Sequence, residues 1–250
     1  MSSFTSFDGT RLAYEAEGDG PPVLLLHGFA ADSHANWVRP HVVEALVAAG
    51  RRAVTLDARG HGRSDKPHDP AAYEGDAMVR DAQALLDHLA LDQVDVCGYS
   101  MGAMTTYALV GREPRARSAV LGGVGARLGG DSLARRAPLI ADALLTDDPT
   151  TITDRGAAAF RAFADSTGAD RQALAAIQRA RRVRTTEAGT ITVPVLVITG
   201  DRDTLVGSPH ELAARIPGAR AQVVSGDHLS AVFDPAFRRA IVDFLAAVPA

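Results

Sequence analysis

Short apolar runs alternate with helix-like stretches along the first half of the chain. Val23–Leu26 is continuously apolar, as expected of a strand that a sheet buries on both faces. Further strand candidates are Ala53–Leu56, Val94–Cys97 and Ser118–Leu121. Helix-like stretches separate the strand candidates, at about Pro40–Ala49, Asp76–Leu91 and Met101–Val110. This alternation predicts a parallel sheet that is wrapped by helices.

A β-hairpin is predicted ahead of the first buried strand. Asp8-Gly9 lies between two strand-like segments, Ser3–Phe7 and Thr10–Glu17. Asp and Gly suit the positive φ angles of a tight hairpin turn. The N-terminal hairpin therefore adds two strands to the expected sheet.

The alternation stops between Ala126 and Gly189. This segment contains helical stretches and no convincing strand; the stretches are Leu133–Leu145, Gly156–Asp165 and Asp170–Val183. Strand-like runs return at Pro194–Ile198 and Ala221–Val224, and a last helix follows at about Pro235–Ala247. We therefore expect one core domain, residues 1–125 and 190–250, with a helical cap, residues 126–189, inserted after its sixth strand.

Charge and composition narrow the classes of function. The chain carries 26 Lys and Arg against 30 Asp and Glu, and this mildly acidic balance favours neither nucleic acid nor a membrane as a partner. The single cysteine, Cys97, cannot form an internal disulfide or a structural zinc site alone. Residues 1–8 lack a signal-peptide pattern, and no apolar stretch approaches the roughly 18 residues of a membrane helix. We therefore expect a cytoplasmic globular protein; its oligomeric state does not follow from the sequence.

One glycine-rich turn carries the clearest chemical signal. Gly98-Tyr99-Ser100-Met101-Gly102 stands between a predicted strand and a predicted helix. Glycines two residues on either side of a serine let the neighbouring chain pass without a Cβ clash, and the strained turn lifts the hydroxyl onto the helix start. Unpaired N–H groups and the positive end of the helix dipole stabilise an oxyanion there. Ser100 is therefore a candidate nucleophile.

A serine nucleophile needs a base, and the base needs a group that orients it. Of the eight histidines, His228 lies in a loop after a late strand, and Asp203 follows the strand that ends at Ile198. The carboxyl ends of parallel strands share one edge of a sheet, so Ser100, Asp203 and His228 are expected to meet there. Other carboxylates compete for the acid role: Asp201 above all, then Asp131 and Asp227.

These residues are part of a wider resemblance to the α/β-hydrolase superfamily, which covers nearly the whole chain. Its motifs are Leu26-His27-Gly28-Phe29, Asp57-Ala58-Arg59-Gly60-His61-Gly62-Arg63-Ser64, the turn around Ser100, Gly200-Asp201-Arg202-Asp203, and the histidine at 228. The resemblance implies a mostly parallel eight-stranded sheet flanked by helices, with a small helical cap after the sixth strand. It assigns the nucleophile to Ser100, the general base and acid to His228, and the orienting carboxylate to Asp203. It also implies that the backbone N–H groups of Phe29 and Met101 form an oxyanion hole, with no metal or cofactor.

The leading functional hypothesis is a serine hydrolase that cleaves a small carboxylic ester or lactone through an acyl-enzyme. The alternatives on the same fold are a C–C bond hydrolase or a cofactor-free perhydrolase (haloperoxidase), since Ser100-Met101 resembles the elbow of that branch. A non-catalytic ligand-binding member is a further alternative. Epoxide hydrolases and haloalkane dehalogenases of this fold place Asp at the elbow, so Ser100 argues against both. His27 and His61 are interpreted as residues that hydrogen-bond and pack within their loops.

Overall fold

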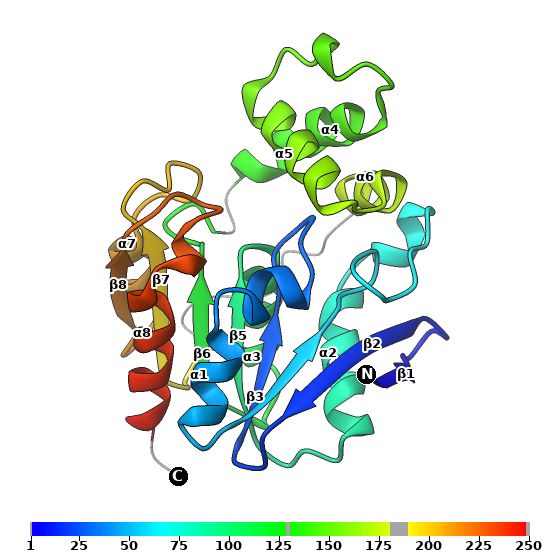
Figure 1. Cartoon of the computed structure of the whole chain (residues 1–250). Helices are drawn as coiled ribbons and strands as arrows, with labels where there is room; N and C mark the ends of the chain where they lie inside the picture. Colours follow the sequence, from blue (N-terminus) through cyan, green and yellow to red (C-terminus); the bar gives the residue numbers. More distant parts are fainter. Residues whose placement is uncertain (1, 129–130, 181–189, 249–250) are drawn as a thin grey trace.

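The computed structural model of the protein describes residues 2–128, 131–180 and 190–248. Within these residues eight strands form one sheet, and helices pack against both of its faces (Figure 1). The strands are β1 (Ser2–Thr5), β2 (Arg11–Glu17), β3 (Pro22–Leu26), β4 (Arg52–Leu56), β5 (Val94–Tyr99), β6 (Ala116–Gly122), β7 (Val195–Gly200) and β8 (Arg220–Val224). The α-helices are α1 (Val42–Ala48), α2 (Ala77–His88), α3 (Met101–Val110), α4 (Asp131–Leu145), α5 (Arg155–Thr167), α6 (Arg171–Arg179), α7 (Pro209–Ala213) and α8 (Pro235–Ala246). Shorter helical turns are η1 (His34–Val38), η2 (Pro70–Tyr73), η3 (Pro149–Thr151) and η5 (Ala231–Phe233).

The strand order is β1-β2-β4-β3-β5-β6-β7-β8. The hairpin strands β1 and β2 pair antiparallel, β2 pairs antiparallel with β4, and every pairing from β4 to β8 is parallel. The expected mostly parallel eight-stranded sheet is therefore confirmed. Because β5, β7 and β8 run parallel, the loops that follow them leave the sheet at one edge.

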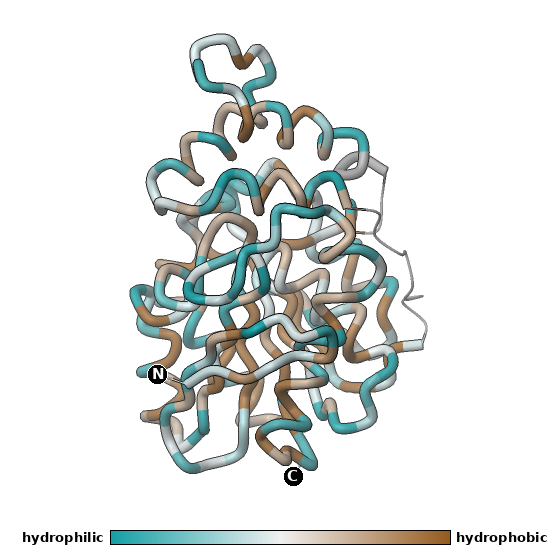
Figure 2. Tube along the Cα trace, turned by 90° about the vertical axis from the view of Figure 1, so that its right-hand side faces the viewer, coloured by the Kyte–Doolittle hydropathy of each residue, from teal (hydrophilic) through white to brown (hydrophobic). Residues whose placement is uncertain are grey.

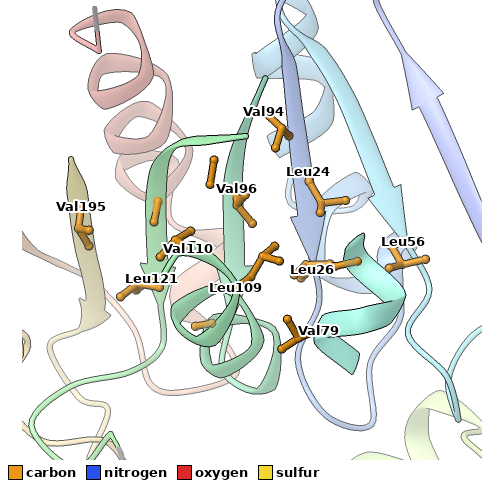
Figure 3. Close-up of a cluster of buried hydrophobic side chains, with 14 of the residues drawn as sticks. Leu24, Leu26, Leu56, Val79, Val94, Val96, Leu109, Val110, Leu121 and Val195 are labelled. Atoms are coloured by element: carbon orange, nitrogen blue, oxygen red, sulfur yellow. The ribbon is translucent and has the colours of Figure 1, made fainter. Parts of the chain in front are cut away.

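The buried strands are continuously apolar because both of their faces pack against a hydrophobic core. In β3, Leu24 and Leu26 contribute to the cluster between the sheet and helices α2 and α3 (Figure 3). Val23 and Leu25 point the other way, into a cluster that contains Trp37 and residues of α1 and α8. Full burial of such side chains contributes roughly 1.5–3 kcal/mol each. Apolar segments accordingly gather inside the molecule (Figure 2).

Helices α4, α5 and α6 lie between β6 and β7 in the sequence and above the sheet in Figure 1. Aspartates start two of these helices: Asp154 accepts a hydrogen bond from the Ala157 N–H, and Asp170 accepts one from the Ala173 N–H. Gly168, at φ +66°, ends α5 in the left-handed conformation that glycine adopts most readily. The three helices pack on one another through an apolar cluster that also includes Phe29 and Met101 of the expected site.

The structure differs from the sequence-based expectation at several element ends. The helix predicted to run through Val183 ends at Arg179, because Ala180 has extended backbone angles; residues 181–183 lie outside the described residues. Helix α7 was not predicted, although Ser208 accepts a hydrogen bond from the Glu211 N–H and Pro209 opens the helix. The division into a core domain and a cap at residues 126–189 stays a prediction.

Candidate active site

Ser100 lies at the junction of β5 and α3 with strained backbone angles. Its φ of +52° and ψ of −109° fall in a region that non-glycine residues rarely adopt. The two flanking glycines are required by close backbone contacts. A Cβ on Gly98 would clash with the carbonyl oxygen of Gly102, and a Cβ on Gly102 would clash with the carbonyl oxygen of Leu26. The chain can therefore hold the serine hydroxyl at this turn only with glycine at both positions.

Ser100, His228 and Asp203 form a continuous hydrogen-bonded chain. The Ser100 Oγ lies 2.9 Å from the His228 Nε2, and the His228 Nδ1 lies 2.7 Å from the Asp203 Oδ2. The Asp203 side chain has no exposed surface, and 13% of the His228 side chain is exposed. The three side chains come from the ends of three parallel strands, as the sequence analysis expected.

The competing carboxylates have other partners. Asp201 accepts a hydrogen bond from the Gly226 N–H at 2.9 Å, two residues before His228. Asp227 accepts bonds from the N–H groups of Leu229 and Ser230. The side chain of Asp131 lies outside the described residues. Among the described carboxylates, Asp203 therefore holds the imidazole, while Asp201 and Asp227 shape the loop that carries it.

The two expected oxyanion donors are the N–H groups of Phe29 and Met101. Neither N–H has an acceptor among the residues that the structure describes. On both sides of Phe29 the backbone N–H groups are bonded to side chains: that of Gly28 to the Asn36 Oδ1 at 2.9 Å, and that of Ala30 to the His61 Nε2 at 3.1 Å. These two bonds fix the loop on both sides of Phe29, and the Phe29 N–H stays available as a donor. Sequence analysis did not identify Asn36, because nothing in its local pattern marks it.

His27 and His61 hold this loop as neutral imidazoles. Each accepts a backbone N–H at its Nε2, His27 from Ala58 and His61 from Ala30, so each carries its proton on Nδ1. The Nδ1–H of His27 donates to the carbonyl of Gly28, which confirms its expected bond within the loop. Burial lowers the pKa of both side chains, that of His61 to about 3, with the neighbouring His27 lowering it further.

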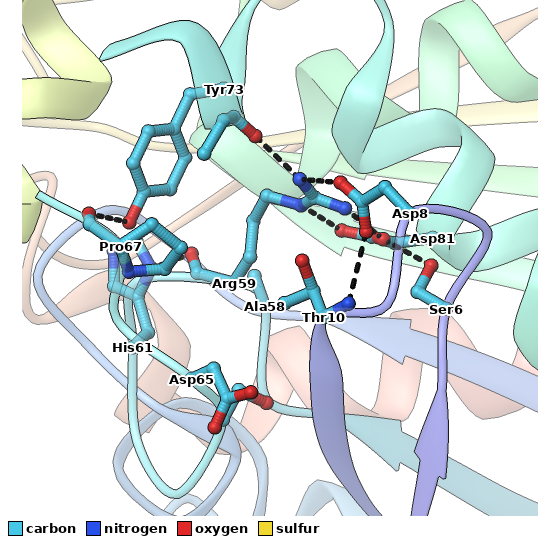
Figure 4. A network of polar contacts seen from close by, with 12 residues as sticks. Ser6, Asp8, Thr10, Ala58, Arg59, His61, Asp65, Pro67, Tyr73 and Asp81 are labelled. Atoms are coloured by element: carbon cyan, nitrogen blue, oxygen red, sulfur yellow. Dashed lines mark hydrogen bonds and ion pairs between the residues drawn. The ribbon is translucent and has the colours of Figure 1, made fainter. Parts of the chain in front are cut away.

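A buried ionic network lies beside His61 on the same loop (Figure 4). The Arg59 guanidinium has no exposed surface and donates two hydrogen bonds of 2.6 Å to the carboxylate of Asp81, as well as one to Asp8 in the N-terminal hairpin. Burial raises the pKa of Asp81, and the bonds from Arg59 oppose that rise. For Asp8, hydrogen bonds from Arg59 and Thr10 outweigh burial and lower the pKa to about 2. The network joins the hairpin to the loop that carries His61.

Helix α5 reaches the same loop from above. The ring of Phe160 packs edge-on against that of Phe29, with 5.8 Å between the centroids. The Thr167 hydroxyl lies 2.9 Å from the carbonyl oxygen of Ala30, to which it can donate. Both of these contacts are therefore made by uncharged side chains of α5.

Two further properties concern metals and membranes. Among the described residues, no group of three or more His, Cys, Asp or Glu side chains is arranged to hold a metal ion. No described helix is both long and apolar enough to cross a bilayer.

Comparison with known proteins identifies the fold. A family model described as the alpha/beta hydrolase fold matches residues 21–125. The chain is also similar in structure to the enol-lactonase from Burkholderia xenovorans LB400, with 29% identity, a TM-score of 0.72, and coverage of 98% of this chain and 100% of that one. A thermophilic esterase from Thermogutta terrifontis is similar as well, with 25% identity, a TM-score of 0.79, and coverage of 99% and 98%. The protein therefore has the α/β-hydrolase fold.

Among curated sequences, the chain is 37% identical over 102 residues to Epoxide hydrolase 2 of Siraitia grosvenorii. That match covers 41% of this chain and 31% of the relative. The matched segment therefore spans about a third of the relative.

Proposed function

We propose that the protein is a serine hydrolase that cleaves a small carboxylic ester or lactone through an acyl-enzyme. The observation that carries the proposal is the hydrogen-bonded chain from the Ser100 hydroxyl through His228 to Asp203. Likeness to an enol-lactonase and to an esterase over the whole chain supports the same reaction class. Epoxide hydrolases of this fold carry Asp at the elbow, where this chain has Ser100.

In this proposal the His228 Nε2 takes the proton of the Ser100 hydroxyl as Oγ attacks the acyl carbon. The resulting oxyanion accepts hydrogen bonds from the N–H groups of Phe29 and Met101, and loss of one such donor costs about 3 kcal/mol of barrier. His228 then returns the proton to the leaving alkoxide as the acyl C–O bond breaks. A water molecule repeats the sequence and releases the acid. With a lactone, the alkoxide stays attached to the same acyl chain.

Steady-state hydrolysis of short p-nitrophenyl esters and of a lactone panel tests the proposal. We expect turnover by the wild type and a loss of at least about a thousandfold in Ser100→Ala, because the triad acts as a unit. Equal rates in the two proteins would remove Ser100 as nucleophile. Fluorophosphonate labelling that fails at Ser100 would favour a ligand-binding protein instead. Peracid formation from acetate and peroxide that exceeds esterase activity would favour the perhydrolase alternative.

A further inference from the structure

Tyr99 connects the strand of the nucleophile to the loop of the base. It is the last residue of β5, directly before Ser100, and only 5% of its surface is exposed. Its hydroxyl donates a hydrogen bond of 2.8 Å to the backbone carbonyl of His228. No other described group donates to that carbonyl. The bond therefore acts on the residue whose ring reaches both Ser100 and Asp203.

The Tyr99 ring has little freedom to move. Two glycines at the end of β6 make room for it: a Cβ on Gly122 would lie 2.8 Å from the ring, and one on Gly123 would lie 2.7 Å from it. Phe237 of α8 packs edge-on against the same ring, at a centroid distance of 5.7 Å. Because the ring is fixed on these sides, the position of its hydroxyl is fixed as well.

The other anchors of the His228 loop act on neighbouring residues. Asp201 bonds the N–H of Gly226, and Asp227 bonds the N–H groups of the two residues after His228. Burial raises the pKa of Tyr99, and the charges of Asp203 and Asp227 raise it further, so the hydroxyl stays protonated and keeps its proton to donate.

We propose that Tyr99 is a positioning residue that holds the backbone of His228 at the distance at which the imidazole bridges Ser100 and Asp203. The inference rests on the proposed function. Under this inference, the residue before the nucleophile fixes the backbone of His228, which the hydrogen bonds among Ser100, His228 and Asp203 do not do by themselves. The hydroxyl carries this task. The ring fills the space between β6 and α8 and lies 5.8 Å from the His228 ring, measured between centroids, and Tyr99→Phe keeps this contact.

The test compares Tyr99→Phe, which keeps the ring, with Tyr14→Phe as a matched control. Tyr14 also loses a hydroxyl with a partner, since its oxygen lies 3.2 Å from the His88 Nε2 on the N-terminal hairpin side. Fluorophosphonate titration counts competent sites, and kcat is expressed per titrated site. We expect kcat per site of Tyr99→Phe to fall about tenfold, equivalent to about 1.4 kcal/mol of barrier, with KM within about twofold. The control should match the wild type.

A structural role would change a different quantity. It would lower the thermal midpoint or the number of titratable sites and leave kcat per site unchanged, and that outcome overturns the inference. A second measurement does not depend on turnover: the downfield proton NMR signal of the His228 Nδ1–H that is bonded to Asp203. We expect this signal to broaden in Tyr99→Phe and to persist in the control.

The NMR signal separates failure of the inference from failure of the proposed function. If the wild type hydrolyses nothing in the panel, the proposed function fails, and the signal still decides whether Tyr99 positions His228. An unchanged signal in Tyr99→Phe overturns the inference whatever the rate.

Discussion

The buried imidazole of His61 makes a quantitative prediction about acid stability. Its pKa falls from 6.5 to about 3 on folding, first because it is buried and then because His27 lies beside it. A pKa that is depressed in the folded state stabilises the protein at pH values above 6.5, and the stabilisation is lost as the pH falls towards 3. At pH 5, about 1.5 units below the unfolded value, the loss is about 2 kcal/mol, since each unit corresponds to about 1.4 kcal/mol. That is a large share of a typical stability of roughly 5–15 kcal/mol.

The variant His61→Gln separates this contribution from others. The Gln Oε1 can still accept the Ala30 N–H but does not titrate. We therefore expect the wild type to lose about 2 kcal/mol more than His61→Gln between pH 6.5 and pH 5. Carboxylates, with ordinary pKa values near 4, titrate mostly below this window.

Urea unfolding followed by the fluorescence of Trp37 measures the effect. Trp37 is the single tryptophan of the chain and has no exposed surface, so its emission reports loss of the core. The exposed His210, changed to Gln, serves as the control and should keep the wild-type dependence on pH. If the free energy of unfolding falls equally in the wild type and in His61→Gln between pH 6.5 and pH 5, the reasoning is refuted, because the fold would then not hold His61 neutral.

Two further predictions concern the buried network and the orienting acid. Arg59→Leu leaves the buried carboxylate of Asp81 with only the Ser6 hydroxyl as a hydrogen-bond donor, so the free energy of unfolding from urea titration should fall by about 3–5 kcal/mol; a loss below about 1 kcal/mol would contradict the role of the pair. Asp203→Asn should lower kcat by about a thousandfold or more, since the orienting group of His228 is lost. Asp201→Asn affects the bond to the Gly226 N–H and the pair with Arg202, neither of which touches the imidazole, and should lower kcat less than about tenfold. Equal losses in the two variants, measured as kcat per titrated site, would contradict the assignment of the acid.

Much of the fold was predictable because its signals are local. Apolar runs such as Val23–Leu26 reflect burial on two faces, and the turn around Ser100 needs glycine at positions 98 and 102 for reasons that a short segment already contains. Once the sheet is parallel, convergence of Ser100, Asp203 and His228 at one edge follows from strand direction. The number of positions between the three residues in the sequence does not predict the distances between their side chains in the folded protein.

The supporting contacts could not be predicted, because no local pattern marks them. Asn36 bonds the Gly28 N–H eight positions away through an irregular loop, and the Tyr99 hydroxyl meets the carbonyl of His228 across 129 positions. The local pattern alone left Asp201 and Asp203 open, and the resemblance assigned the acid role to Asp203. Only the loop conformation separates an acid that holds the imidazole from one that holds the Gly226 N–H.

The contacts of α5 with residues 29 and 30 link a helix that lies between β6 and β7 in the sequence to a loop near Ser100. Phe160 touches the ring of Phe29, and Thr167 lies within bonding distance of the Ala30 carbonyl. Under the proposed function, a substitution in α5 that removes either contact would weaken the support of residue 29, whose N–H is the proposed oxyanion donor. Libraries built on α5 are therefore expected to contain variants with altered turnover although Ser100, His228 and Asp203 are unchanged.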